Sequence, residues 1–219
     1  MRELLLFVAT WAGPALSIGM LAPIAWRPIA DRGVSGLSAT GTIATALAVQ
    51  LWLTYGLLVG DPRQIGVNLA VTAVRVAIMA AAVWACREPR IRALAGAAMV
   101  GGVALGFAGA VTVGAAATLV STLNRAPQAA FTIRRGRGAG LSVAGFSLGV
   151  AADLSWVAYG IVYGDAFVFG ASVICAAFDA LIVLAATRPD HALIAAARRA
   201  LEPDVAPADL TPFGVVAGD

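Results

Sequence analysis

The sequence predicts an all-α integral membrane protein, with seven transmembrane helices arranged as two parallel three-helix bundles joined by a linker helix (3+1+3). Three observations support this fold class. The chain of 219 residues is 60% hydrophobic and only 12% charged, whereas soluble domains usually carry about 25% charged residues. Seven apolar segments are long enough to cross a bilayer. The sequence pattern of the first three segments recurs in the last three.

The recurrence has a fixed offset of 104 residues. Trp52 recurs as Trp156, and the Gly-Leu-Ser sequence that begins at Gly36 recurs at Gly140. A repeat of this length indicates one structural unit used twice, and many membrane transporters are built from such repeats. The other matched positions are Pro23 with Pro127, Tyr55 with Tyr159, Gly56 with Gly160, Gly60 with Gly164 and Asp61 with Asp165.

Each predicted span is a run of about 20 apolar residues, which is the length that a helix rising 1.5 Å per residue needs. Very short turns join the second span to the third and the sixth to the seventh, so each pair forms an antiparallel hairpin. The break between the fourth and fifth spans is predicted near Gly106 to Gly109. The seven segments are residues 4–26, 37–59, 64–85, 91–108, 111–131, 141–163 and 166–186.

These spans divide the chain into four parts. Residues 1–86 form the first repeat, 87–110 the linker helix, 111–187 the second repeat and 188–219 a cytoplasmic tail. Because three crossings reverse the chain direction, the linker helix allows the two repeats to run parallel. The tail is expected to contain an amphipathic stretch at 192–201 and to be partly disordered beyond it. The first apolar segment is expected to remain as a span, since it is longer than a signal-peptide core.

The placement of arginine residues predicts the orientation in the membrane. Loops on one side contain eleven arginines, whereas the loops on the other contain only Arg2 and Arg63. Cytoplasmic loops carry an excess of positive charge. We therefore expect a multi-pass plasma-membrane protein with its N-terminus outside and its C-terminus in the cytoplasm. The eleven are Arg27, Arg32, Arg87, Arg90, Arg92, Arg134, Arg135, Arg137, Arg188, Arg198 and Arg199.

The repeated unit resembles those of the SWEET and SemiSWEET sugar transporters of the PQ-loop superfamily. The resemblance rests on a proline in the first helix, Gly-Leu-Ser opening the second, and Trp-x-x-Tyr-Gly-x-x-x-Gly-Asp closing it. The second repeat also has the Pro127-Gln128 dipeptide, where the first has Pro23-Ile24. The resemblance covers residues 12–187. It implies a sugar carrier that works by alternating access around one site between the repeats.

Four residues are candidates for that central site. Trp52 lies eight residues before the Gly60 turn and Asn68 eight after it, so a helical hairpin places both at one depth. Trp156 and Ser172 occupy the same places in the second repeat. Two aromatic faces with neutral hydrogen-bonding groups suit a sugar, and the resemblance implies a matching Trp and Asn on each half. Ser172 departs from that pattern because its side chain is shorter. The alternative roles are helix packing or interfacial anchoring for the tryptophans and an interhelical hydrogen bond for Asn68.

The residues that end the second helix of each repeat are candidates for an extracellular gate. The resemblance assigns closing contacts between hydroxyl and carboxylate groups to these positions, which are Tyr55 and Asp61 in the first repeat and Tyr159 and Asp165 in the second. The alternative is that each Gly-Asp sequence makes a turn and caps the next helix. The two roles are compatible.

Charged residues inside the predicted spans are costly and commonly functional. Arg75 and Asp179 occupy equivalent positions in the two repeats, so we expect them to pair, either as an intracellular gate or as a static link. Arg125 and Asp153 form a second candidate pair, and Asp153 alternatively faces the substrate. Neither of these two charges has a counterpart in the first repeat.

The prolines of the first helix in each repeat are candidates for hinges. Pro23 and Pro127 each remove one backbone hydrogen bond, and Gln128 follows the second proline. A kink at these positions is expected to allow the halves to rock, although motionless kinks are also common in membrane helices.

Several function classes are excluded or disfavoured by the sequence. We expect no enzyme, no metal, no cofactor and no nucleic-acid partner, because no nucleophile–base pair, metal-ligand spacing or basic stripe with aromatic residues occurs. The predicted partners are the lipid bilayer and a small-molecule substrate, a sugar, and one chain is sufficient for one pore. The alternatives are a proton-coupled carrier of amino acids or other small zwitterions and a non-transporting receptor.

Overall fold

The computed structural model describes residues 2–20, 39–85, 88–136 and 141–201. All regular elements in these ranges are helices. The first predicted span is a nearly continuous helix made of α1 (Arg2–Phe7), a π-helical turn η1 (Val8–Ala12) and α2 (Gly13–Gly19). Pro14 lies in the first turn of α2, where a missing N–H is tolerated. The predicted hinge residue Pro23 lies outside the described residues.

The two predicted hairpins are present. Helices α4 (Ala39–Val59) and α5 (Pro62–Ala85) form the first, and α8 (Val143–Tyr163) and α9 (Ala166–Thr187) form the second. Gly60 and Gly164 turn the chain with φ of 71° and 70°, a left-handed conformation that costs glycine little. We call the end of the molecule that carries these two turns the turn end.

The linker helix and the long helix after it are separated where the sequence predicts a break. Helix α6 (Pro89–Leu105) continues into a 3₁₀ turn, η2 (Gly106–Ala108), and Gly109 then reverses the backbone with a φ of 89°. Helix α7 (Ala110–Arg135) follows, with Pro127 in its interior. It is longer than predicted at both ends.

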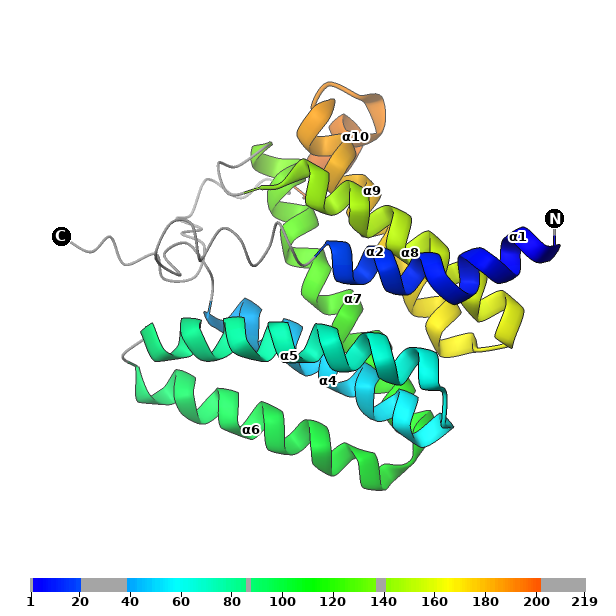
Figure 1. Ribbon diagram of the computed structural model, residues 1–219. Coiled ribbons are helices and arrows are strands. Elements are labelled where there is room, and N and C mark those ends of the chain that lie inside the picture. The colour runs from blue at the N-terminus through cyan, green and yellow to red at the C-terminus, as the bar shows by residue number, and fades with distance from the viewer. Residues whose placement is uncertain (1, 21–38, 86–87, 137–140, 202–219) are drawn as a thin grey trace.

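The two halves contact each other through equivalent pairs of helices. Helix α4 packs against α7, and α8 packs against α2 and the π-helical turn before it. Under the offset of 104 residues, α4 corresponds to α8 and α2 to the middle of α7, so these two interfaces are related by pseudo-symmetry. Figure 1 shows α4, α5 and α6 on one side of the molecule, α8 and α9 on the other, and α7 running between them.

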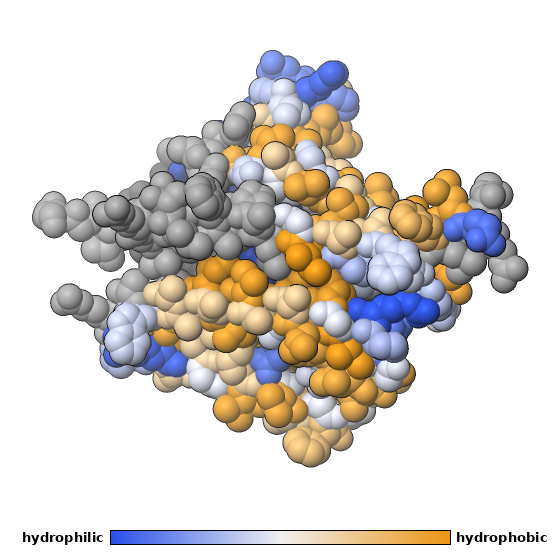
Figure 2. Space-filling view, viewed as in Figure 1, coloured by the Kyte–Doolittle hydropathy of each residue, from blue (hydrophilic) through white to orange (hydrophobic). Residues whose placement is uncertain are grey.

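Five of the described helices, α4, α5, α6, α8 and α9, are long and apolar enough to cross a membrane. Helix α6 lies on the outside of α4, and together with η2 it contributes an apolar outer face: Val100 of α6 is 70% exposed and Phe107 of η2 is 93% exposed. Figure 2 shows hydrophobic side chains over the face formed by α5 and α6. Such a surface requires lipid around it, so the chain is a multi-pass membrane protein.

The predicted amphipathic stretch of the tail is helix α10 (Ala192–Leu201). It packs against α7 and α9 at the end opposite the turn end, which we call the tail end, and its Ile194 is completely buried. Arg198 donates from Nε to the carbonyl oxygen of Ile133 at 2.9 Å, and Arg134 donates from Nη2 to that of Leu201 at 2.8 Å. Each helix thereby satisfies a carbonyl near the C-terminus of the other.

Candidate functional site

The two predicted pocket tryptophans form reciprocal hydrogen bonds across the repeats. Trp52 on α4 donates from Nε1 to Ser121 Oγ on α7 at 3.0 Å, and Trp156 on α8 donates to Ser17 Oγ on α2 at 2.9 Å. The two serines are equivalent under the same offset of 104 residues, as are the two indoles. The sequence analysis missed both serines, although their recurrence was a signal that could have found them.

Each indole is also held by an aromatic neighbour one turn closer to the turn end. The ring centroids of Trp52 and Tyr55 are 5.7 Å apart and those of Trp156 and Tyr159 are 5.1 Å apart, both in edge-to-face geometry. Trp156 in addition packs against the apolar face of α5 at Val67 and Val71. The tryptophans therefore lie at the contact between the halves, with their indole N–H groups bonded to the opposite half.

The predicted polar partners of the tryptophans lie on α5 and α9. Ser172 is buried and Asn68 is partly buried. Within the described part of the chain, neither side chain takes part in a hydrogen bond with another residue. The role of these two side chains in binding a solute stays a prediction.

A cluster of three charged residues lies inside the second repeat. Arg125 on α7 donates from Nε to Asp179 Oδ1 on α9 at 3.1 Å, and its Nη2 lies 3.5 Å from Asp153 Oδ2 on α8. The predicted contact between Arg125 and Asp153 is thus present. Because its geometry is not that of a hydrogen bond, Asp153 Oδ2 is buried without a donor.

The predicted pair of Arg75 with Asp179 is not formed in this structure. Asp179, whose side chain is 4% exposed, is bonded to Arg125, which lies on the adjacent helix of the same repeat. The reason is local: Gly149 on α8 has no side chain, and the Asp179 carboxylate fills the space that a Cβ would occupy there. The equivalent position in the first repeat is Thr45, so Gly149 is a further residue that comparison of the repeats could have identified.

The turn end is held together by the carboxylate of Asp165. Its Oδ1 accepts from the backbone N–H groups of Phe167 and Val168, which makes Asp165 the N-cap of α9. The same oxygen accepts from the Tyr55 hydroxyl at 3.1 Å, and Oδ2 accepts from Gln64 Nε2 at 3.1 Å. Asp165 therefore caps a helix and joins the repeats at once. Gln64, which is 1% exposed, was not among the predicted residues.

The equivalent contact between Tyr159 and Asp61 is not formed. Tyr159 is 1% exposed and its hydroxyl has no partner among the described residues. Asp61 instead accepts from the backbone N–H of Arg63 at 2.9 Å. The Arg63 guanidinium lies 4.4 Å from the ring centroid of Tyr163 and adds a further contact between the halves. The pseudo-symmetry of the fold is therefore broken at the turn end.

The second predicted hinge lies where the sequence places it. Pro127 interrupts the hydrogen bonds of α7, which continues to Arg135. Gln128 donates from Nε2 to Thr132 Oγ1 at 3.2 Å, one turn further along the same helix. This hydrogen bond lies within α7 and does not connect Gln128 to another helix. Motion at Pro127 stays a prediction.

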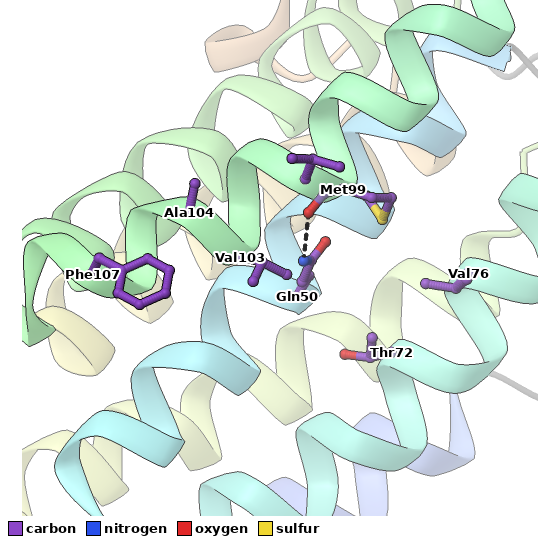
Figure 3. Close-up of a pocket in the computed structure, with 8 residues that line it drawn as sticks. Gln50, Thr72, Val76, Met99, Val103, Ala104 and Phe107 are labelled. Carbon is purple, nitrogen blue, oxygen red and sulfur yellow. Dashed lines mark hydrogen bonds between the residues drawn. The ribbon is translucent and has the colours of Figure 1, made fainter.

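An apolar groove of about 700 Å³ lies on the outer side of the first repeat, away from the tryptophans. In the close-up of Figure 3, Gln50 on α4 donates to the carbonyl oxygen of Met99 on α6 at 2.9 Å, beside Thr72 of α5. Most of the lining is apolar, including the exposed side chains of Val103 and Phe107. A lining that is mostly apolar suits lipid chains better than it suits a sugar.

The comparison with solved structures reveals a similar fold. A structure of a eukaryotic SWEET transporter superposes with a TM-score of 0.69 and 16% sequence identity, covering 84% of this chain and 95% of that one. No protein-family model matches the sequence, and neither does any curated protein. At this identity the likeness shows the fold: the chain has the architecture of a SWEET transporter.

Proposed function

We propose that this chain is a membrane transporter that carries a sugar by facilitated diffusion and alternating access. The observation that carries the proposal is the pair of reciprocal tryptophan–serine bonds, because it places two aromatic side chains and two serine hydroxyls where the repeats meet. A mono- or disaccharide has apolar ring faces and hydroxyl edges that match such a site. No covalent chemistry is required.

The contacts at the turn end support the alternating-access part of the proposal. Tyr55 and Gln64 of the first repeat both bind Asp165 of the second, which corresponds to a carrier closed on this side. Opening requires these bonds and the tryptophan–serine bonds to break while the halves rock. Pro127 is the hinge that the second repeat offers, because its helix lacks one backbone hydrogen bond there.

The membrane arrangement of the proposal follows the repeat. We infer seven spans, arranged as two parallel three-helix units that α6 joins. The protein lies in the plasma membrane, with the turn end outside the cell and α10 in the cytoplasm. The pseudo-symmetric interfaces of α4 with α7 and of α2 with α8 support this arrangement. They also support one pore within one chain.

The test is uptake of labelled glucose and sucrose into proteoliposomes that contain the purified protein. We expect saturable flux that needs no pH gradient. Replacing Trp52 and Trp156 together by alanine is expected to lower this flux at least tenfold, because each aromatic face and its contact across the repeats are lost.

Trp84→Ala is the matched control, since Trp84 is 84% exposed on the outside of α5, and it is expected to transport as the parent does. Binding of sugar without flux would indicate a receptor. Equal flux in the double variant and the parent would contradict a site at the two indoles.

A further inference from the structure

Helix α7 changes its partners near Pro127. In the part before the proline, Ser121 accepts a hydrogen bond from Trp52 of the first repeat. Asn124 likewise donates from Nδ2 to Thr45 Oγ1 on α4 at 2.8 Å. A proline inside a helix removes one backbone hydrogen bond and allows a kink. The parts of α7 on either side of Pro127 can therefore change their angle to each other.

The part of α7 after the proline, residues 128–135, packs on α9 of the second repeat; we call it the arm. Its Ala129 and Ile133 are 2% and 5% exposed and belong to buried clusters with side chains of α9. Arg125, just before the proline, is bonded to α9 as well. A bend at Pro127 therefore moves the arm relative to the part of α7 that is bonded to the first repeat.

Helix α10 covers the seam between the arm and α9. Its Ile194 is completely buried, in one cluster with Ile133 of the arm and Ala185 of α9. Residues three and four apart share one face of a helix. The face that α10 turns towards the rest of the protein contains Ile194, Ala197, Arg198 and Leu201.

Two hydrogen bonds with cationic donors fix α10 to the arm. Arg198 binds the carbonyl oxygen of Ile133, and Arg134 binds that of Leu201. The last carbonyls of a helix have no partner within it, and hydrogen bonds from charged donors are about twice as strong as neutral ones. The arm and α10 thus hold each other at their C-terminal ends.

The turn of residues 188–191 fixes α10 to α9 at the other end of α10. The backbone N–H of His191 donates to the carbonyl oxygen of Arg188 at 3.1 Å, and His191 Nδ1 accepts from the backbone N–H of Leu193 at 3.2 Å. This turn follows α9 directly. Helix α10 is therefore joined to α9 by the chain and to the arm by side-chain contacts.

We propose that α10 is a clamp that fixes the arm of α7 to α9, so that both move as one body when α7 bends at Pro127. This rests on the proposed transport function, because alternating access requires such a bend between the halves. The clamp passes the bend on to α9 and so to the tail end of the second repeat. Without it, the arm moves by itself and the tail end does not follow.

Distances between spin labels test the clamp in a cysteine-free background. One pair is at Arg135 and Thr187, which are exposed at the ends of the arm and of α9. The other is at Arg135 and Trp84, which lies on α5 of the first repeat. We expect a single narrow distance for the first pair and two populations for the second. Two populations within the first pair of the parent protein would overturn the proposal.

Two variants loosen the clamp, and each has a matched control on the same helix. Ile194→Asp places a charge in the buried cluster, whereas Leu193→Asp places it at the neighbouring residue, which is 52% exposed. Arg198→Gln removes the charged donor to the arm, whereas Arg199→Gln changes an exposed arginine. Thermal unfolding of each variant checks that it is folded.

Ile194→Asp is expected to broaden the distance between Arg135 and Thr187. We expect hydrogen exchange of the arm amides to become at least about tenfold faster, and the maximal rate of sugar flux to fall by at least about fivefold with the binding affinity unchanged. Arg198→Gln should act in the same direction but less. The variants Leu193→Asp and Arg199→Gln should behave as the parent does.

The outcomes separate the clamp from the transport function. If the parent transports sugar and folded Ile194→Asp has the parent's flux, distances and exchange rates, the clamp is overturned and the transport function stands. If no sugar crosses the membrane, but Ile194→Asp broadens the first distance and speeds exchange in the arm while Leu193→Asp does neither, the clamp stands and the transport function fails. Equal effects of Ile194→Asp and Leu193→Asp would also overturn the clamp.

Discussion

Replacing Arg125 by leucine is expected to destabilise the protein by about 3–5 kcal/mol. The substitution removes the cation that binds Asp179 and Asp153, and both carboxylates are largely buried, with side chains 4% and 13% exposed. Leucine is the residue at the equivalent position of the first repeat, Leu21. The measurement is thermal or denaturant unfolding of the purified protein in detergent, followed by tryptophan fluorescence.

The matched control removes the carboxylates together with the arginine. Arg125→Leu combined with Asp153→Val and Asp179→Asn leaves no uncompensated charge in this cluster, and we expect it to recover most of the lost stability. A single variant as stable as the parent would show that Arg125 does not hold the three helices of the second repeat together.

Replacing Asp165 by alanine is expected to cost about 3–7 kcal/mol and to weaken the closed turn end. The variant loses the N-cap of α9, worth about 1 kcal/mol, and leaves the Tyr55 hydroxyl and the buried Gln64 amide without their acceptor, each at about 1–3 kcal/mol. The same unfolding measurement checks the loss. Asp61→Ala is the matched control, because Asp61 is the equivalent residue and accepts only the backbone N–H of Arg63 among the described hydrogen bonds.

We expect Asp61→Ala to cost less than about 1 kcal/mol. Equal losses of stability in the two variants would mean that the contacts of Asp165 with Tyr55 and Gln64 do not make it more important for stability than Asp61. A larger loss for Asp61→Ala would indicate that the contact between Tyr159 and Asp61 dominates in solution.

The helices were predictable from the sequence because the length of each apolar segment and the repeat together indicate where they begin and end. The bounds of α8 and α9 and the extent of α10 differ from prediction by at most two residues. The Gly-Asp turns were recognisable because glycine tolerates positive φ and aspartate caps a helix. The repeat also predicted which residues share one depth, since it fixed the hairpins.

Side-chain partners were less predictable, because they depend on which neighbouring helix approaches most closely. Position in the repeat suggested that Asp179 pairs with Arg75, yet the close packing of α7 and α9 and the space left by Gly149 give it to Arg125. The serines that bind the tryptophans were missed for a related reason. Their significance depends on the interfaces of α2 with α8 and of α4 with α7, which hydropathy does not specify.

The sequence shows that the two repeats differ, but it does not show which contacts differ as a result. Equivalent positions predicted two Tyr–Asp contacts, and only Tyr55 with Asp165 is formed. The other carboxylate, Asp61, is occupied by its own turn. A symmetric pattern in sequence therefore does not require symmetric contacts.

The central claim is that the two halves rock about a site between them, and distances at the two ends test it most directly. Spin labels at Leu58 and Ile161 report on the turn end, since both residues are exposed there, on α4 and α8. Labels at Trp84 and Arg188 report on the tail end, on α5 and after α9. Both native cysteines are replaced first by alanine.

Pulsed dipolar spectroscopy in liposomes is expected to show two populations at each end. The longer distance at the turn end should accompany the shorter distance at the tail end. In Asp165→Ala, the distances of both label pairs should shift towards the state that is open at the turn end. A single, unchanged distance distribution at both ends, with or without solute and in Asp165→Ala, would contradict alternating access.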